Sequence, residues 1–599
     1  MAFFSLQAIS TGLISTIKRF PLEVLVVVIG SISACLIIAD VSFSQSDDIL
    51  SRFLITSVFT LPLILSVSLY TENIKSKLLK FFLLTAAVII SIVFFFLLPE
   101  KYVHRNVLTI ILLIFSTHLS VSFAPFLKNS SEEQFWNYNK ELFLRLLLSG
   151  LYSFVLFAGL ALALLAIDNL FNVEIEEELY GYLFVIIAGV FNSLFFLSGI
   201  PRSASKQYYV YPKGLKIFTQ FVLLPLVSIY IIILYMYAGK ILVNWEWPTG
   251  WVSYLVISLS VVGVFSLLLV YPIRFSIEYR WIRIYSSIFY WALFPLAIML
   301  FAAISRRINE YGVTENRYYV ILIAIWLLMI AIFQMITKQR KIRIIPISLF
   351  VIVLLSLLGP WSAFSISKNA QLQRLDQLLE NNKLIQNGYV IGEFKEIDFK
   401  DCADISSINQ YLVEMHGRDV LQKYFKEPVD SLIFDTVYTQ DYVQLTEKMG
   451  IDFVYAWDYE ENQQDNFSYY STSNSPDIHN VHGIDYLIHY SDYFYLKEKK
   501  LYNRNYQCDS LDINISFDGN SGDVKVNILN DTMLLNIEEW VNELWSKNAP
   551  GALPDNRSLA IMEDSVCKVS VKLESINGSI VDNRPEINSV IADFYIELK

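Results

Sequence analysis

A short polar stretch between two long apolar runs holds the densest group of ionisable side chains expected near a membrane. It reads RRINEYGVTENR, and its candidate binding residues are Arg306, Arg307, Glu310, Tyr311, Glu315 and Arg317. Guanidinium groups bind carboxylates and phosphates through two parallel hydrogen bonds, so the stretch could hold a lipid headgroup or an anionic substrate. The alternative is a salt-bridged turn, in which the glutamates neutralise the arginines and Gly312 reverses the chain. We favour the turn.

Polar side chains inside or beside apolar runs are functional candidates because burying them in lipid is costly. Arg145 precedes a run that is rich in glycine and alanine, and Asn192 lies within the next run. A substrate path would use such groups, whereas hydrogen bonds between helices are the structural alternative, which we favour. Arg145 and Asn192 complete the set of candidate binding residues. Other polar groups inside the runs are His118, Gln220 and Gln334.

Three histidines and two aspartates in the stretch DIHNVHGIDYLIHY have side chains that could bind zinc. They are His479, His482, His489, Asp477 and Asp485. Histidines three residues apart can share an ion when they lie on one helix. Gly483 and the alternating apolar residues after it indicate instead a turn that enters a strand, so His479 and His482 need not converge. The sequence therefore predicts neither a metal site nor a cofactor.

No pattern in the sequence identifies a catalytic site. The chain contains no Cys-x-x-Cys pair, no phosphate-binding loop, and no serine hydrolase or zinc protease motif. Cys402, Cys508 and Cys567 lie in the polar last third, where one pair could form a disulfide and leave one thiol free. Catalytic residues are therefore unknown, and enzymatic activity stays an open question.

Membrane-spanning helices must position most of these residues. The 599 residues are 54% hydrophobic and 17% charged, with a mean hydropathy of +0.45, which excludes a soluble, disordered or disulfide-stapled chain. A helix needs about 20 apolar residues to cross a hydrocarbon core of about 30 Å. Eleven runs approach this length, at about 21–39, 53–70, 81–98, 107–126, 146–167, 182–200, 217–239, 252–272, 284–304, 318–337 and 344–360.

The basic residues predict how the chain is oriented in the membrane. Residues 1–20 are expected to form an amphipathic helix on the membrane surface, because apolar residues recur there at helical spacing and Lys18 and Arg19 follow them. Loops rich in lysine and arginine stay in the cytoplasm. The N-terminal segment and every second loop contain 19 such residues, and the intervening loops contain 7. The N-terminus is therefore predicted to be cytoplasmic and, after eleven spans, the C-terminal region extracytoplasmic.

The chain changes character at Lys368. The residues before it carry a net charge of +8, and the 232 residues from it onward carry −19. This last part is long enough to bury its own core, so we expect it to fold alone. The expected order is a transmembrane domain over 21–360, a connecting helix over 361–387 and an α+β domain over 388–599.

Apolar spacing in the last part predicts helices at about 405–415 and 442–449, and alternation predicts strands after about residue 466. The stretches LDINISFD and VKVNIL flank the turn residues 519–522, as in a hairpin, and CKVSVKLESI and SVIADFYIEL predict two further strands. LNIEEWVNELW predicts a helix that buries Leu535, Ile537, Trp540, Val541, Leu544 and Trp545. The fold class is thus an all-α polytopic transmembrane bundle of about eleven helices followed by a soluble α+β domain.

Four stretches carry a resemblance to a known family. They are NKELFLRLLLSGLYSFVLFAGLALALLAIDNLF, NWEWPTGW, RRINEYGVTENRYY and GPWSAFSISKNAQLQRL. Together they resemble an uncharacterised bacterial family of polytopic membrane proteins, the domain of unknown function 4153. The resemblance covers nearly the whole chain and is strongest over residues 134–375. It implies many inner-membrane helices followed by an outer globular domain, and it implies no reaction.

The sequence therefore predicts a multi-pass protein of the bacterial inner membrane that anchors an acidic outer domain, binds an envelope partner there and relays signals. One alternative is a transporter or flippase that holds a small or lipid-linked anionic substrate near Arg145, Asn192 and the stretch from Arg306 to Arg317. The other is a membrane enzyme that acts on lipid-linked substrates. The expected partners are the lipid bilayer and an envelope protein or anionic lipid, and nucleic acid is not expected.

Overall fold

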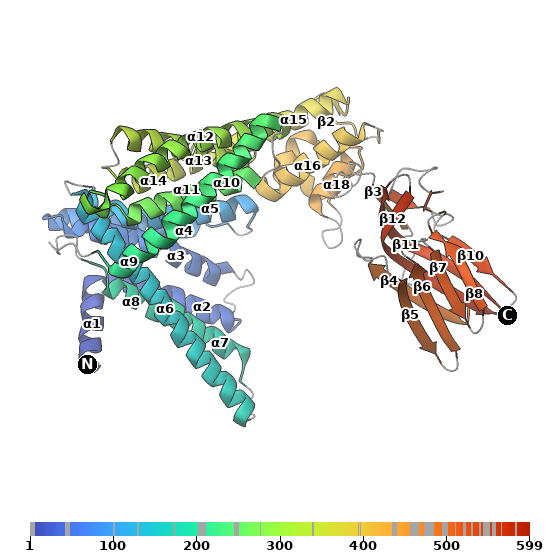
Figure 1. Cartoon of the computed structure of the whole chain (residues 1–599), viewed down its shortest axis with the longest axis horizontal. Coiled ribbons are helices and arrows are strands. Elements are labelled where there is room, and N and C mark those ends of the chain that lie inside the picture. The colour runs from blue at the N-terminus through green and yellow to red at the C-terminus, as the bar shows by residue number, and fades with distance from the viewer. Residues whose placement is uncertain are drawn as a thin grey trace. The chain divides into compact units, whose positions relative to one another are not determined.

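The computed structural model of the chain divides into two compact units (Figure 1). Unit 1 comprises Met1–Glu380 and Leu412–Gln422, and unit 2 comprises Asn381–Tyr411 and Lys423–Lys599. The structure describes residues 6–599 except 42–47, 100–101, 128–130, 172, 174, 202–210, 245–250, 276, 338–340, 393, 396, 434–439, 456–465, 472–483, 494–500, 509–510, 519–522, 529–530, 538, 540, 543–550, 554–558, 565 and 582–583.

Unit 1 is a bundle of apolar helices, as the composition predicts. Among the described residues, nine helical stretches are long and apolar enough to cross a membrane. They are α2 (Pro21–Ile38); α3 (Asp48–Glu72); α4 (Lys77–Leu97); α5 (His104–Phe123) with η1 (Ala124–Phe126); α6 (Glu132–Phe171); α7 (Glu177–Phe184) with η2 (Val185–Phe191) and α8 (Asn192–Ser198); α9 (Lys213–Phe218) with η3 (Thr219–Leu223) and α10 (Leu224–Asn244); η5 (Ile277–Tyr279) with α12 (Arg280–Tyr311); and α13 (Glu315–Ile336). The multi-pass bundle is confirmed.

Two shorter apolar helices occupy the eighth and eleventh predicted runs. They are α11 (Trp251–Leu269) and α14 (Ile344–Leu357). The 14 residues of α14 extend about 21 Å at 1.5 Å per residue, less than the thickness of a hydrocarbon core. The expectation of eleven spans therefore stays a prediction for these two. The N-terminal segment is helical in α1 (Leu6–Arg19), and its place on the membrane surface also stays a prediction.

Local hydrogen bonds explain where some of these helices begin. Before α6, the Ser131 hydroxyl accepts from the Gln134 amide at 3.1 Å, and the Gln134 side-chain oxygen accepts from the Ser131 amide at 3.3 Å. Before α4, the Ser76 hydroxyl accepts from the Leu79 amide. Each bond satisfies a main-chain group that the first turn of a helix leaves without a partner.

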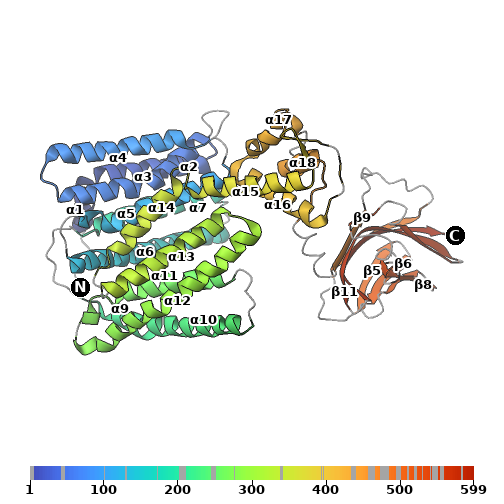
Figure 2. The same ribbon diagram turned by 90° about the horizontal axis from the view of Figure 1, so that it is seen from above.

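The helices pack in two neighbouring groups within unit 1 (Figure 2). In the first group, α3 contacts α2, α4 and α5, and α5 also contacts α14. Gly30 of α2 allows close packing, because a Cβ atom there would lie 2.8 Å from Cβ of Ser57 in α3. In the second group, α10 to α13 share a buried cluster that includes Leu234, Val256, Phe289 and Ala324.

Unit 2 begins with short elements and ends in two sheets whose strands are mostly antiparallel. Helix α15 (Ala363–Asn381) leads into the hairpin of β1 (Ile385–Gln386) and β2 (Tyr389–Val390). The segments α16 (Phe399–His416), η6 (Arg418–Tyr424), α17 (Val429–Leu432) and α18 (Asp441–Lys448) follow. The last turn of α16 and most of η6 belong to unit 1. The buried residues of α16 and α18 include Ile405, Ile408, Leu412 and Leu445, as the helical spacing predicts.

One sheet has the strand order β4-β12-β11-β3-β9, with β10 also paired to β11, and the other has the order β5-β6-β7-β8. Their bounds are β3 (Asn466–Ser471), β4 (Tyr486–Tyr493), β5 (Leu501–Cys508), β6 (Leu511–Asp518), β7 (Asp523–Ile528), β8 (Asp531–Asn536), β9 (Gly551–Leu553), β10 (Leu559–Glu563), β11 (Cys567–Val581) and β12 (Arg584–Leu598). Alternate residues of both sheets, such as Val526, Val571 and Phe594, form one buried core.

The four strands predicted from LDINISFD, VKVNIL, CKVSVKLESI and SVIADFYIEL are confirmed as β6, β7, β11 and β12. The helix predicted from LNIEEWVNELW is wrong at its start, because Leu535 lies in β8 and pairs with Val524 of β7. The helical conformation begins at Ile537 and includes Val541, and both side chains are buried. Trp540, Leu544, Trp545 and the turn residues 519–522 lie outside the described residues.

Candidate functional site

The polar stretch after α12 folds into a tight turn that leads into α13. Gly312 ends α12 at a φ of 75° and ψ of 178°, a conformation that only glycine adopts readily. Nη1 of Arg317 donates to the carbonyl oxygens of Tyr311 and Gly312 at 3.0 and 2.8 Å. Nε2 of Gln371, in α15, donates to the carbonyl oxygens of Tyr311 and Val313 at 3.2 and 3.0 Å. Two side chains thus bind carbonyls that the helix end leaves without intrahelical partners.

A buried carboxylate and imidazole face each other beside this turn. Oε1 of Glu315 lies 3.4 Å from Nε2 of His416, and the two side chains are 1% and 2% exposed. Glu315 is the first residue of α13, where the helix dipole favours a negative charge, and His416 ends α16, where it favours a positive one. Separating a buried pair of this kind leaves each group without the solvation that it lost on burial.

The N-terminal end of α5 also contacts the segment that contains His416. The Nδ1 atom of His104, the first residue of α5, lies 3.2 Å from the carbonyl oxygen of Glu414. We call His104, Tyr311–Arg317, Gln371 and Glu414–His416 the junction. The junction joins α5, α12, α13 and α15 to residues 412–422, and all of these parts belong to unit 1.

The candidate residues of the polar stretch take different places in this arrangement. Nε of Arg306 pairs with Oε1 of Glu310 at 2.8 Å one helical turn away, and the two side chains are 53% and 45% exposed. Arg307 is partly buried and Tyr311 is exposed. An arginine–glutamate pair is therefore present, whereas Glu315 faces His416. Sequence spacing gave no signal for that contact, because helical and strand periodicity report only local neighbours. A role in binding stays a prediction for all six residues.

Arg145 and Asn192 lie elsewhere in unit 1, on α6 and α8. The Arg145 side chain packs against Gly199, which follows the last residue of α8, and Asn192 is the first residue of that helix. Arg145 therefore lies where the dipole of α8 favours a positive charge. The buried Oδ1 atom of Asn192 has no hydrogen-bond partner in the part of the chain that the structure describes.

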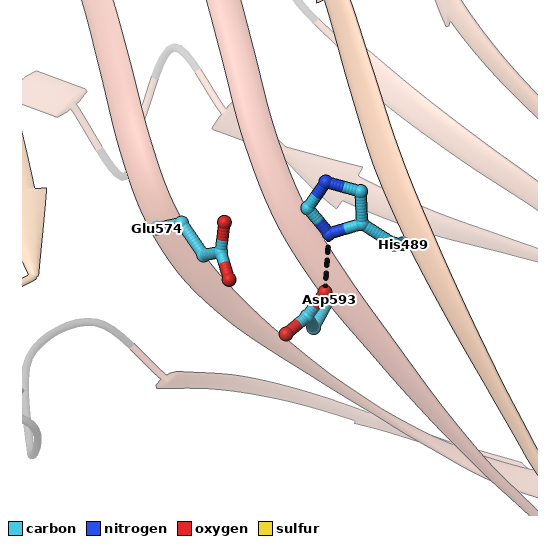
Figure 3. Close-up of side chains that lie close together, drawn as sticks. All are labelled: His489, Glu574 and Asp593. Carbon is cyan, nitrogen blue, oxygen red and sulfur yellow. Dashed lines mark hydrogen bonds and ion pairs between the residues drawn. The ribbon is translucent and has the colours of Figure 1, made fainter. Parts of the chain in front are cut away.

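The histidine-rich stretch contributes one residue to a second cluster, in unit 2. Nδ1 of His489, in β4, lies 2.8 Å from Oδ1 of Asp593 in β12, and Glu574 of β11 lies beside them (Figure 3). One possible ligand atom from each residue lies within 4.8 Å of the other two. Asp485 accepts instead from the Leu598 amide at 2.7 Å. Asp477, His479 and His482 lie outside the described residues.

No disulfide joins any two of Cys402, Cys508 and Cys567. Cys402 and Cys567 are free thiols, and each possible pair among Cys402, Cys508 and Cys567 includes one of them. Burial raises the pKa of the Cys402 thiol, and the aspartates near it raise it further. Burial also raises the pKa of the Cys567 thiol. Both thiols are thus less often in the nucleophilic thiolate form than an ordinary cysteine.

Comparison with known proteins identifies a family without a described activity. The family model described as Domain of unknown function (DUF4153) matches residues 26–392. The uncharacterized protein PM1469 of Pasteurella multocida (strain Pm70) is 25% identical over 334 residues, which are 51% of this chain and 54% of that protein. The match thus spans about half the length of this curated relative. No solved structure matches the chain.

Proposed function

The chain belongs to the DUF4153 family of unknown function, and we propose that it is a membrane-anchored protein of the bacterial cell envelope that relays the state of its extramembrane region to its helices. The observation that carries this proposal is the junction, where the buried Glu315–His416 pair holds residues 412–422 within unit 1. An anchor needs only a spanning helix, whereas a relay also needs an extramembrane segment that biases the helix ends.

The course of the chain supports this role. It leaves unit 1 after Glu380, returns at Leu412 and leaves again after Gln422, so residues 412–422 are covalently linked at both ends to unit 2. A change in unit 2 that moved Tyr411 or Lys423 would pull residues 412–422 and so strain the contact between Glu315 and His416. Such a pair favours two states, formed or broken, because intermediate separations offer the two polar groups neither a partner nor water.

We place the protein in the inner membrane, with its N-terminus in the cytoplasm and its C-terminal region outside it. The support is the asymmetry of lysine and arginine between alternate loops, 19 against 7. The partner outside the cytoplasm would be an envelope protein or an anionic lipid. A reporter enzyme that is active only outside the cytoplasm, fused after Lys599, should be active. Activity of a cytoplasm-only reporter at that position would contradict this placement.

Hydrogen exchange can test the relay itself on the full-length protein in lipid nanodiscs. His416→Gln removes the imidazole, so amide exchange should accelerate in residues 311–318 as well as in 412–422. Glu315→Gln should accelerate exchange in the same two segments, because each substitution leaves the other member of the pair buried without its partner.

Asp419→Asn is the matched control, since Asp419 lies in the same segment with an exposed side chain. It should leave exchange in both segments unchanged. The relay would be contradicted if His416→Gln altered only residues 412–422 and left the turn between α12 and α13 as protected as in the wild type.

Transport is a second candidate, favoured by two π-helical segments. A π-helical turn inside a helix disturbs the regular hydrogen bonds and often marks a functional site. The segment η2 ends directly before Asn192, and η3 contains Gln220. Within the described residues, the buried Oδ1 of Asn192 and Nε2 of Gln220 have no hydrogen-bond partners.

This candidate has its own test in reconstituted vesicles. Fluorescent phosphatidylglycerol should move between leaflets faster when the protein is present, and Asn192→Leu or Gln220→Leu should slow that movement. A rate equal to that of protein-free vesicles would remove this candidate and leave the relay proposal unaffected.

A further inference from the structure

Three neighbouring strands bring one imidazole and two carboxylates together on the face of a sheet opposite its core. β12 lies between β4 and β11, and Asp593 is paired in register with His489 on one side and Lys572 on the other. Residues on either side of Asp593, Ala592 and Phe594, point into the core and are buried. Strand alternation therefore puts Asp593 and His489 on the opposite face.

Glu574 of β11 lies on this face as well, at an irregularity in the strand pairing. The pairing of β11 with β12 shifts between Leu573 and Ser575, so Glu574 is an extra residue without a register partner. Leu573 and Ile576 are buried in the core, which leaves Glu574 and Ser575 as two consecutive residues on the other face. Glu574 lies two residues after Lys572, so strand alternation puts both side chains on the face of Asp593.

The charges and exposure of the cluster suit a cation. Two carboxylate side chains and one imidazole lie together in this small region. The Asp593 side chain is 9% exposed, whereas that of His489 is 59% exposed and Glu574 is exposed too. One ligand is thus held firmly, and two can turn toward an ion that enters from solvent.

We propose that His489, Asp593 and Glu574 form a binding site for a divalent transition-metal ion such as Zn²⁺. Imidazole nitrogen and carboxylate oxygen are ligands of zinc, at about 2.0–2.2 Å from the ion. The three ligand atoms already lie within 4.8 Å of one another, and rotation of the exposed side chains brings them closer. Three protein ligands leave a further coordination position for water or for a group from another molecule.

Binding of the ion must displace a proton. A carboxylate only accepts hydrogen bonds, so Nδ1 of His489 carries the proton that it shares with Asp593. The ion takes the Nδ1 lone pair, so in the neutral imidazole the proton moves by way of water to Nε2, and from the imidazolium form one proton leaves to solvent. Lys572 opposes binding, because its positive charge faces Asp593 across the strands. Affinity should therefore fall with decreasing pH and rise when Lys572 is replaced by methionine.

Calorimetric titration of the full-length protein in nanodiscs with Zn²⁺ tests the site, with Co²⁺ absorption as a second readout of ligand geometry. Glu574→Gln, Asp593→Asn and His489→Ala should each weaken Zn²⁺ binding by about tenfold or more, as loss of a ligand costs at least as much as loss of a supporting hydrogen bond. Glu574→Gln is decisive, because its side chain is exposed and the substitution leaves the core untouched.

Glu597→Gln is the matched control, as Glu597 is an exposed glutamate on the same face of β12, four residues from Asp593. It should bind Zn²⁺ as the wild type does. His482→Ala should also leave binding unchanged. The proposal is overturned if Glu574→Gln and Asp593→Asn bind Zn²⁺ with wild-type affinity, or if binding depends on His482 and not on the two carboxylates.

Discussion

Two imidazole–carboxylate pairs in the described parts of the chain differ mainly in their access to water. In unit 1, Glu315 and His416 lie 3.4 Å apart with side chains 1% and 2% exposed. In unit 2, His489 lies 2.8 Å from Asp593, but its side chain is 59% exposed. The first pair joins helix ends to a segment far along the chain, whereas the second lies on the open face of a sheet beside another carboxylate.

Because the two pairs differ in exposure, the same chemical groups have different roles in them. A buried pair has no competing partners, so its groups serve to hold the elements that carry them. An exposed pair gains little stability from its attraction, because water screens it, but its groups remain available to a third partner. Burial therefore indicates a positioning role for the junction and a binding role for the cluster on β4, β11 and β12.

The largest expected effect is on the free energy of unfolding, and it should differ between the two imidazole–carboxylate pairs. His416→Ala should lower the free energy of unfolding of unit 1 by about 3–5 kcal/mol, because it leaves a carboxylate buried without its imidazole partner. His489→Ala should change the stability of unit 2 by no more than about 0.5 kcal/mol. Chemical denaturation of the full-length protein in mixed micelles measures both. Equal losses would contradict the division between a holding pair and a binding pair.

A smaller loss of stability is expected when the backbone of the junction is strained at Gly312. Gly312→Ala should destabilise unit 1 by about 1–3 kcal/mol, because Gly312 has a φ of 75° and a ψ of 178°. The added Cβ would also lie 2.9 Å from Nε2 of Gln371. Gly239→Ala is the control, since a Cβ there meets nothing within 4 Å. The double variant Gly312→Ala with Gln371→Ala should keep the backbone strain, and full recovery of stability in it would contradict this account.

The smallest effect concerns pH and a carboxylate of unit 2. Asp564 accepts from the amides of Val566 and Cys567 at 2.7 and 2.8 Å, and these bonds hold its pKa below the ordinary range. A lowered folded pKa contributes stability above the unfolded value of about 3.9, and this stability is lost as pH falls through the folded value. Amide protection at Cys567 should therefore be greater in the wild type than in Asp564→Asn at pH 7, and equal at the acidic end. A difference that persisted unchanged in acid would refute this role.

The fold was largely predictable because its signals are local. Runs of about 20 apolar residues gave the helices of unit 1, and strict alternation gave β6, β7, β11 and β12. The prediction failed at Leu535, where a short apolar stretch fits both a helix and a strand. Pairing with β7 decided for the strand there, and only tertiary structure supplies that contact.

The sites were less predictable because their members are distant in sequence. The polar stretch from Arg306 to Arg317 marked the turn, but its buried partners Gln371 and His416 had no local signal. Among the described residues His489 lies beside Asp593 and Glu574, which are distant from it in sequence, so the spacing of the histidine-rich stretch did not indicate this cluster. Strand register brings these groups together, and it cannot be read from composition or spacing.

The membership of residues 412–422 in unit 1 changes how this protein can be divided for laboratory work. A fragment that starts at Lys368 would include Leu412 and Leu421, which are fully buried, without most of the unit to which they belong. Such a fragment would present these leucines to water and to other copies of itself, which favours aggregation. The expectation that the C-terminal part folds alone from Lys368 therefore applies better to a later start. The sheets from β3 onward form a smaller piece, and the described residues of their buried core all lie within it.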